Sequence, residues 1–170
     1  MRKVMIGTPC YDGKVDAHYA DSLVNTVKLA ALVGIEIHPV YMPYDALIQR
    51  SRNDLVKIAI ESGVDDLIFI DSDQAWNPQW IMRLLSWPVD VVGGAVRKKS
   101  EIEQYNVRCE RFPIPEKGNG LLMVDGVGTG FLRVSQKALQ AVWNQAEPYT
   151  DGGKTSRMVF DVRIVNGQLV

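Results

Sequence analysis

Apolar runs of strand length alternate with helical patterns over the first half of the chain, and this alternation restricts the fold more than any other feature. Short apolar runs and alternating β-branched residues are typical of strands, and the expected strands are residues 4–6, 35–42, 67–70 and 89–96. Apolar residues at helical spacing predict helices between them, over residues 16–32, 46–62 and 78–86. This order of elements predicts an α/β fold with a mostly parallel sheet and helices on both faces.

Capping residues mark where the predicted helices begin and end. Asp45 is expected to cap the second helix, and Asn77 followed by Pro78 is expected to open the third. Gly34 and Gly63 are the expected ends of the first and second helices, because glycine readily adopts the left-handed conformation that often ends a helix.

The alternation weakens after residue 96. Residues 97–120 are polar and irregular, and loops of this length are usually functional or mobile. The remaining segments predict strands at 121–124 and 130–134 around a turn at 126–130, a helix at 136–144 capped by Ser135, a loop at 147–155, an alternating strand at 157–164 and a hairpin turn at 166–167. No linker or internal repeat separates these segments from the first half.

Size, charge and cysteine content exclude several classes of protein. A chain of 170 residues is expected to form one domain, residues 1–170, because a domain averages roughly 150 residues. A net charge of −1 gives no general attraction to nucleic acid, and no apolar run reaches the roughly 18 residues of a membrane span. Cys10 and Cys109 lie too far apart for a metal or redox pair, which favours reduced thiols in a cytoplasmic protein. The oligomeric state is not determined by the sequence.

Two carboxylates follow the most apolar predicted strand directly. Asp71, Ser72 and Asp73 come after residues 67–70, and ligands of open α/β sheets bind at the carboxyl ends of the strands. In an extended chain Asp71 and Asp73 point to the same side, where their oxygens suit a hard divalent cation such as Mg²⁺ or Mn²⁺. The alternative is a pair of solvated carboxylates at a strand end, one of which caps a turn.

Several segments, in this order, resemble the GT-A glycosyltransferases, in particular small family 2-like members from phages and bacteria. The strand ending in the Asp71–Asp73 carboxylates resembles the family's metal-binding DxD motif. The other segments that carry the resemblance are residues 6–12, 50–53, 77–78, 90–94 and 126–133. Together these segments extend over most of the chain, and the resemblance implies a Rossmann-like, three-layer GT-A fold.

The resemblance also implies a site and an activity. It implies metal-assisted transfer of a sugar from a nucleotide-sugar donor to an acceptor that the sequence does not identify. Asp71 and Asp73 would bind Mn²⁺ or Mg²⁺, with Asp73 the first choice as ligand. The residues implied to bind the nucleotide sugar are Thr8, Pro9, Tyr11, Arg52, Asp71, Ser72, Asp73, Gly128 and Thr129.

The chain departs from the family pattern in its last part. In the family an acidic pair such as Glu-Asp often supplies the catalytic base after the last matched segment, and no Glu-Asp pair occurs here. The catalytic residues are therefore not identified. We expect a GT-A domain that lacks the C-terminal catalytic segment, and two alternatives stay open: a truncated chain, or a finished domain without that segment.

Two other functions remain open. A GT-A-like core without turnover would act as a nucleotide-binding or assembly module. A phosphatase of the haloacid dehalogenase type also uses Asp-x-Asp after a strand, but it places this motif on its first strand and needs a later Gly-Asp pair, which is absent here.

Three features near the predicted site have alternative structural roles. Arg97, Lys98 and Lys99 form a basic run at a strand end, which suits either phosphate binding or a solvated loop. Arg52 can reach the carboxylates or the diphosphate, or lie on the helix surface. The glycines around Thr129 can let the backbone approach a ligand, or form a tight turn.

Overall fold

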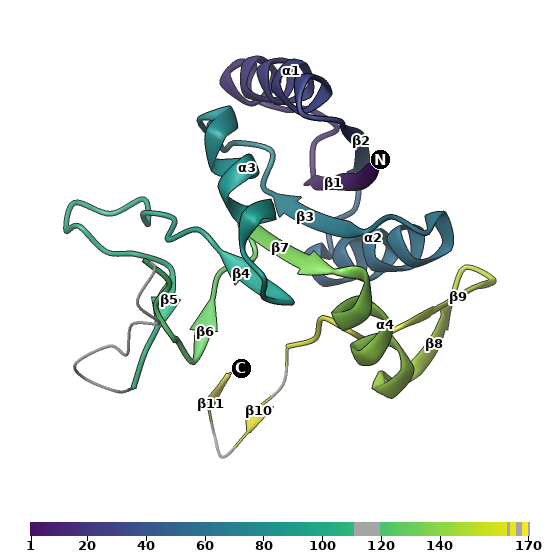
Figure 1. Ribbon diagram of the computed structural model, residues 1–170. Helices are drawn as coiled ribbons and strands as arrows, with labels where there is room; N and C mark the ends of the chain where they lie inside the picture. Colours follow the sequence, from purple (N-terminus) through teal and green to yellow (C-terminus); the bar gives the residue numbers. More distant parts are fainter. Residues whose placement is uncertain (111–119, 163, 166–167, 170) are drawn as a thin grey trace.

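A five-stranded sheet forms the centre of the computed structural model, which describes residues 1–110, 120–162, 164–165 and 168–169 (Figure 1). The strand order is β2-β1-β3-β7-β4. β1 pairs in parallel with both β2 and β3, whereas β7 is antiparallel to its neighbours β3 and β4. All strands except β7 therefore run in one direction, and the prediction of an α/β fold with a mostly parallel sheet is confirmed. The strands are β1 (Arg2–Cys10), β2 (Ile35–Pro43), β3 (Asp66–Ile70), β4 (Val91–Gly93) and β7 (Phe131–Ser135).

Helices cover both faces of this sheet, as the sequence predicts (Figure 1). α1 (Ala17–Leu32) and α3 (Pro78–Ser86) lie on one face, and α2 (Ile48–Ser62) and α4 (Gln136–Gln145) lie on the other. Successive strand residues point to opposite faces, so Ile68 packs with α1 and α3 while Leu67 and Phe69 pack with α2 and α4. Every residue of β3 is buried, which explains why its sequence is continuously apolar after the first position.

The helix ends follow the predicted signals, with one exception. Asn77 accepts a hydrogen bond from the backbone N–H of Gln79 at the start of α3, and Gly63 ends α2 in the left-handed conformation at φ 62°. Asp45 does not cap α2, which begins later than expected, at Ile48. The Asp45 carboxylate instead accepts hydrogen bonds from the backbone N–H of Leu47 and from the Arg50 guanidinium, a charged partner that binds it more strongly than a backbone amide.

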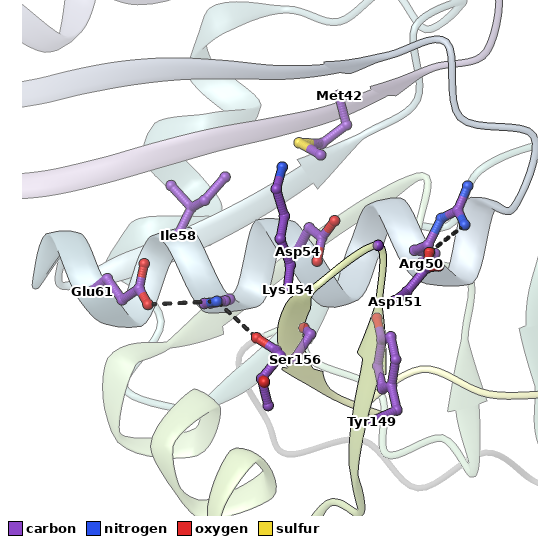
Figure 2. A pocket seen from close by; sticks show the side chains of 12 residues that line it. Met42, Arg50, Asp54, Ile58, Glu61, Tyr149, Asp151, Lys154 and Ser156 are labelled. Atoms are coloured by element: carbon purple, nitrogen blue, oxygen red, sulfur yellow. Dashed lines mark hydrogen bonds and ion pairs between the residues drawn. The ribbon is translucent and has the colours of Figure 1, made fainter.

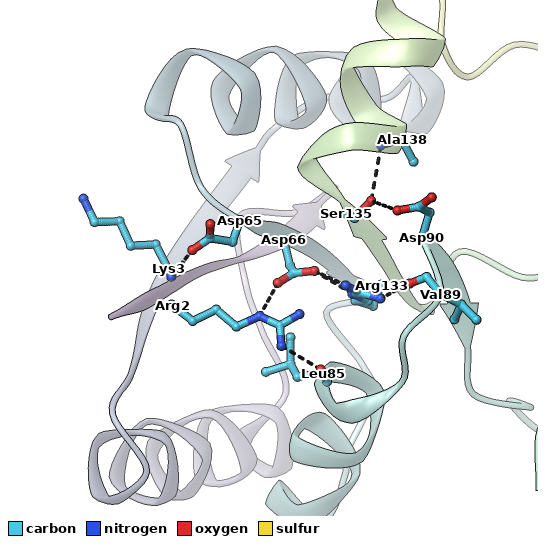
Figure 3. Close-up of polar contacts among 10 residues, drawn as sticks. All are labelled: Arg2, Lys3, Asp65, Asp66, Leu85, Val89, Asp90, Arg133, Ser135 and Ala138. Atoms are coloured by element: carbon cyan, nitrogen blue, oxygen red, sulfur yellow. Dashed lines mark hydrogen bonds and ion pairs between the residues drawn. The ribbon is translucent and has the colours of Figure 1, made fainter. Parts of the chain in front are cut away.

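A buried ion pair joins three strands near the amino end of β3 (Figure 3). Asp66 is only 1% exposed, and its two carboxylate oxygens accept hydrogen bonds from Arg133 Nε at 2.6 Å and Arg2 Nε at 2.7 Å. Arg133 also donates to the carbonyl of Val89, and Arg2 donates to that of Leu85. This network satisfies a buried charge at the edge of the sheet opposite to the carboxyl ends of the parallel strands.

The second half of the chain differs from the prediction in three of its strands. β4 is shorter than the predicted 89–96 because it lies at the sheet edge and pairs only with three residues of β7. The predicted strand at 121–124 is wrong: Leu122 and Met123 are largely exposed, and the chain pairs further on, at β6 (Gly126–Val127), with β5 (Val107–Arg108). β6 also takes up the first part of the predicted turn.

The predicted loop at 147–155 is wrong, because a hairpin forms there. β8 (Pro148–Asp151) pairs antiparallel with β9 (Lys154–Arg157). Gly152 and Gly153 both have positive φ, at 55° and 78°, and form its turn.

The predicted strand at 157–164 is reduced to the end of β9 and to β10 (Ile164–Val165). β10 pairs antiparallel with β11 (Gln168–Leu169), and the predicted turn at 166–167 lies outside the described residues. Within the described part of the chain, no helix is both long and apolar enough to cross a bilayer.

Candidate functional site

The predicted carboxylates lie where the central strand β3 meets the start of β7. Because β7 is antiparallel to β3, its first residue, Phe131, pairs with the last residue of β3, Ile70. The next step brings Asp71 beside Gly130, whose carbonyl accepts a hydrogen bond from the Asp71 N–H at 3.2 Å. The antiparallel strand therefore carries the 128–130 segment to the carboxyl end of β3.

Arg52 and Asp71 form an ion pair at this edge. Arg52 lies on α2, and its Nη2 is 3.1 Å from Asp71 Oδ1, with side-chain exposures of 13% and 37%. Burial lowers the pKa of Arg52, and the Asp71 carboxylate acts in the opposite direction. Arg52 Nε is buried and has no hydrogen-bond partner among the described residues. The alternative of a solvated arginine on the helix surface is therefore wrong, and the guanidinium faces the Asp71 carboxylate.

Gly130 has a specific role in placing the Asp71 side chain. A Cβ atom at Gly130 would lie 2.6 Å from Asp71 Oδ2 and 3.3 Å from its Cγ. Gly130 itself is buried, so the carboxylate is confined between the β7 backbone on one side and Arg52 on the other. The sequence shows this glycine only as part of a turn.

Asp73 lies further out and has a different basic partner. Its Oδ2 is 2.5 Å from Lys99 Nζ, and both side chains are largely exposed, at 51% and 83%. The hydrogen bond to Asp73 raises the pKa of Lys99. The chain turns between the carboxylates, since the Gln74 N–H donates to the Asp71 carbonyl at 3.1 Å. The extended-chain argument for their orientation therefore does not apply.

The carboxylates alone do not form a complete metal site among the described residues. No group of three His, Cys, Asp or Glu side chains in the described ranges is placed to hold a metal ion. Mg²⁺ is usually held by one or two carboxylates, with waters and substrate phosphates completing its coordination. Asp71 and Asp73 would supply that carboxylate pair, and their present partners, Arg52 and Lys99, are cations that compensate the same negative charge.

The predicted ligand-binding residues of the first loop differ in exposure, and two of them, Thr8 and Pro9, lie in β1 and not in a loop. Thr8 is fully buried, and its Oγ1 is 2.5 Å from the hydroxyl of Tyr19 in the core. Pro9 is half-buried, and Tyr11 is 73% exposed. Of these three side chains, Tyr11 is the one on the surface, whereas the Thr8 hydroxyl already has a partner in the interior.

Ser72 and the 128–129 segment are held mainly through their backbones. The Ser72 carbonyl accepts from the N–H of Asp16, the capping residue of α1. The Gly128 N–H donates to the Asn106 carbonyl at 2.9 Å, and a Cβ at Gly128 would overlap the Asn106 side chain, at 1.8 Å from its Nδ2. Thr129 is half-buried in the following turn. The predicted tight turn is therefore present, and Asn106 is a packing partner that sequence patterns did not reveal.

A separate cavity of about 470 Å³ lies between α2 and the β8–β9 hairpin (Figure 2). Its charged side chains largely pair with one another. Arg50 contacts Asp151, and Lys57 donates to the Thr155 carbonyl near Glu61. These contacts attach the hairpin to α2, and none of the predicted site residues lines this cavity.

The comparisons with known proteins support the fold alone. No family model matches the chain, and no curated protein is significantly similar to it in sequence. Among solved structures, A197 from STIV is similar, with a TM-score of 0.58 and 22% identity. The similarity covers 82% of this chain and 68% of that chain. The class that fold and site define is a mixed α/β protein with a carboxylate pair at the carboxyl edge of its sheet.

Proposed function

We propose that the chain is a GT-A-like glycosyltransferase domain that binds a nucleotide-sugar donor with a divalent cation at Asp71 and Asp73. The single observation that carries the proposal is the position of these carboxylates, directly after the buried central strand and beside two cationic side chains. This is the edge at which open α/β sheets bind ligands. A diphosphate brings the negative charge that both a cation and Arg52 would neutralise.

Each residue of the site has a proposed task. Asp71 and Asp73 would hold Mg²⁺ or Mn²⁺, which supplies charge stabilisation for the diphosphate leaving group. Arg52, half-buried on α2, holds the Asp71 carboxylate in place. Lys99 is exposed and can move from Asp73 to a phosphate oxygen. Tyr11 offers an exposed ring on which a nucleobase can stack.

The mixed sheet also supports this proposal. The antiparallel β7 between β3 and β4 delivers the glycine-containing 128–130 segment to the carboxylates. The segment resembles the one that precedes the acceptor site in small GT-A enzymes. The proposal assigns no catalytic base among the described residues. It therefore covers the binding of the donor and of the metal.

The experiment is a donor-cleavage assay. The protein is incubated with UDP-glucose, UDP-N-acetylglucosamine, GDP-mannose or dTDP-glucose and Mn²⁺, and release of the nucleoside diphosphate is measured. We expect release from one nucleotide class, lost in EDTA and in Asp73→Asn. Binding of a nucleotide without release would favour the non-catalytic nucleotide-binding module, and release of inorganic phosphate from 4-nitrophenyl phosphate would favour a phosphatase.

Asp90→Asn is the matched control for Asp73→Asn. Asp90 and Lys137 form an ion pair with side-chain exposures of 48% and 83%, close to those of Asp73 and Lys99. Asp90 precedes β4, so it lies at the opposite edge of the sheet. Equal loss of activity in both variants would refute the assignment of Asp73 to the donor site.

A further inference from the structure

A second cavity, lined by aromatic side chains, adjoins the carboxylate site. It lies between α3, β4 and the segments that follow β4, and its volume is about 560 Å³. Small-molecule sites commonly measure roughly 300–1,000 Å³. Gln74 and Ala75, which line it, directly follow Asp73 in the chain, so one wall of the cavity continues from the proposed metal site.

The walls of this cavity are large apolar rings. Trp76, Trp80, Trp87, Tyr105 and Phe131 all line it. Trp80 is 55% exposed and Tyr105 is 46% exposed, although burial of such rings is strongly favourable. Exposed rings at the mouth of a cavity provide a surface on which the apolar face of a sugar ring can pack.

The charge of the cavity has one sign. Among the described residues that line it, the charged side chains are Arg83 and Arg97, and no carboxylate is present. The Arg83 guanidinium lies 5.8 Å from the centre of the Trp87 ring, which orients it over an aromatic face. Guanidinium groups bind carboxylates and phosphates in a bidentate manner. The cavity thus combines apolar rings with two guanidinium groups that can bind an anion.

Two glycines at the end of β4 line one wall of the cavity and allow close packing there. A Cβ at Gly94 would lie 2.8 Å from the Phe131 ring, and one at Gly93 would lie 2.6 Å from Val127. The glycines therefore let β4 pack directly against β7 and β6.

We propose that this cavity is the acceptor subsite and that it binds an anionic sugar, with a carboxylate or phosphate group on Arg83 and Arg97 and the ring packed on Trp80. The assignment of this cavity as an acceptor subsite rests on the proposed function, because the bound sugar is an acceptor only if Asp71 and Asp73 hold a sugar donor. The binding itself depends only on the cavity.

Isothermal titration calorimetry with three matched probes tests the binding. The probes are 4-nitrophenyl β-D-glucuronide, 4-nitrophenyl β-D-glucoside and 4-nitrophenyl phosphate. We expect the glucuronide to bind about tenfold or more tightly than the glucoside, since a hydrogen bond to a charged group is stronger than one to a neutral group. Equal affinity for these two sugars would overturn the role of the arginines. Equal or tighter binding of 4-nitrophenyl phosphate would overturn recognition of the sugar ring.

Variants locate the binding. Arg97→Gln is expected to remove most of the difference between glucuronide and glucoside, and Trp80→Ala to weaken both about tenfold. Arg108→Gln removes an exposed charge from β5, outside the cavity, and should change neither affinity. Thermal unfolding of each variant verifies that it folds. Undiminished glucuronide binding by folded Arg97→Gln and Trp80→Ala would refute the proposed subsite.

The outcome separates this inference from the proposed function. Glucuronide binding is measured without nucleotide or metal, and donor binding is measured without glucuronide. Donor binding without glucuronide binding would refute the subsite alone. Glucuronide binding without any nucleotide binding would refute the glycosyltransferase assignment and leave a sugar-binding cavity.

Discussion

Replacement of Gly130 by alanine is expected to displace the Asp71 carboxylate without removing any charged group. The new Cβ would lie 2.6 Å from Asp71 Oδ2, whereas ordinary van der Waals contact begins at 3.4 Å, so the oxygen must move by about 0.8 Å. The clashing atom is the end of a side chain that can rotate, and Gly130 has no positive φ. The backbone can therefore keep its course while the carboxylate is displaced.

The size of this displacement decides its effect on a metal site. Metal–ligand distances stay within about 0.2 Å of their standard values, so a shift of about 0.8 Å removes Asp71 from a site built for it. The clashing oxygen is Oδ2, and Arg52 contacts the other oxygen, Oδ1, at 3.1 Å, so rotation of the carboxylate also disturbs that contact. We expect metal-dependent nucleotide affinity to fall by about 10- to 100-fold, the usual effect of losing a supporting contact at a metal site.

The assay is nucleotide titration in Mn²⁺, with thermal unfolding measured in parallel. Gly126→Ala is the matched control, because its Cβ would meet Arg108 at an unstrained 3.7 Å. The control should bind as the unmodified protein does. Gly130→Ala that folds and binds nucleotide with unchanged affinity would refute the placement of Asp71 in the site.

Three further predictions concern the fold and the loop before α2. Asp66→Asn should lower the free energy of unfolding by about 3–5 kcal/mol in urea, because it leaves buried arginine charge without its counter-ion; a loss below 1 kcal/mol would contradict this. Thr26→Val should cost about 1–3 kcal/mol in the same assay, since the buried Trp76 Nε1–H loses its 2.8 Å acceptor; unchanged stability would show that the indole finds another partner. The Arg50 hydrogen bond lowers the pKa of Asp45 below 3.8, so its contribution to stability is present above that pH and disappears as pH falls through the lowered pKa. Thermal unfolding should therefore show a difference between Asp45→Asn and the unmodified protein at pH 7 that shrinks as the pH falls through the lowered pKa, and a constant difference would be inconsistent with this linkage.

Much of the first half of the fold follows from local sequence signals. The continuous apolar run before Asp71 predicts a strand buried on both faces, and β3 is entirely buried. Asn77 with Pro78 predicts the start of α3, and the structure has the cap hydrogen bond there. These signals succeed because each depends on residues within one turn or one strand.

The second half depends on partners that are distant in the sequence. β7 is predicted as a strand, but its position between β3 and β4 is set by long-range pairing that no local pattern contains. The β8–β9 hairpin has no apolar strand pattern, because its residues are polar and it packs against α2 through ion pairs such as Arg50–Asp151.

The candidate site shows the same division. The sequence identified Asp71 and Asp73 from their place after a strand, and it singled out Lys99 only within a basic run. The pairing of Lys99 with Asp73 joins residues 26 positions apart. The confinement of Asp71 by Gly130 likewise requires the antiparallel β7. The burial of the Thr8 hydroxyl against Tyr19 could not be read from the loop that follows it.

The most direct test of the account is a thermal-shift panel of UDP, GDP, CDP and TDP, each with Mn²⁺, Mg²⁺ or EDTA. A ligand that binds only the folded state, at about 100 times its Kd, adds roughly 2.7 kcal/mol to stability, which raises the melting temperature by several degrees in a chain of this size. The account predicts such a shift for one nucleotide, dependent on the metal, lost in Asp73→Asn and kept in Asp90→Asn. A shift of equal size in EDTA, or no shift with any nucleotide and metal, would contradict a metal-dependent donor site at Asp71 and Asp73.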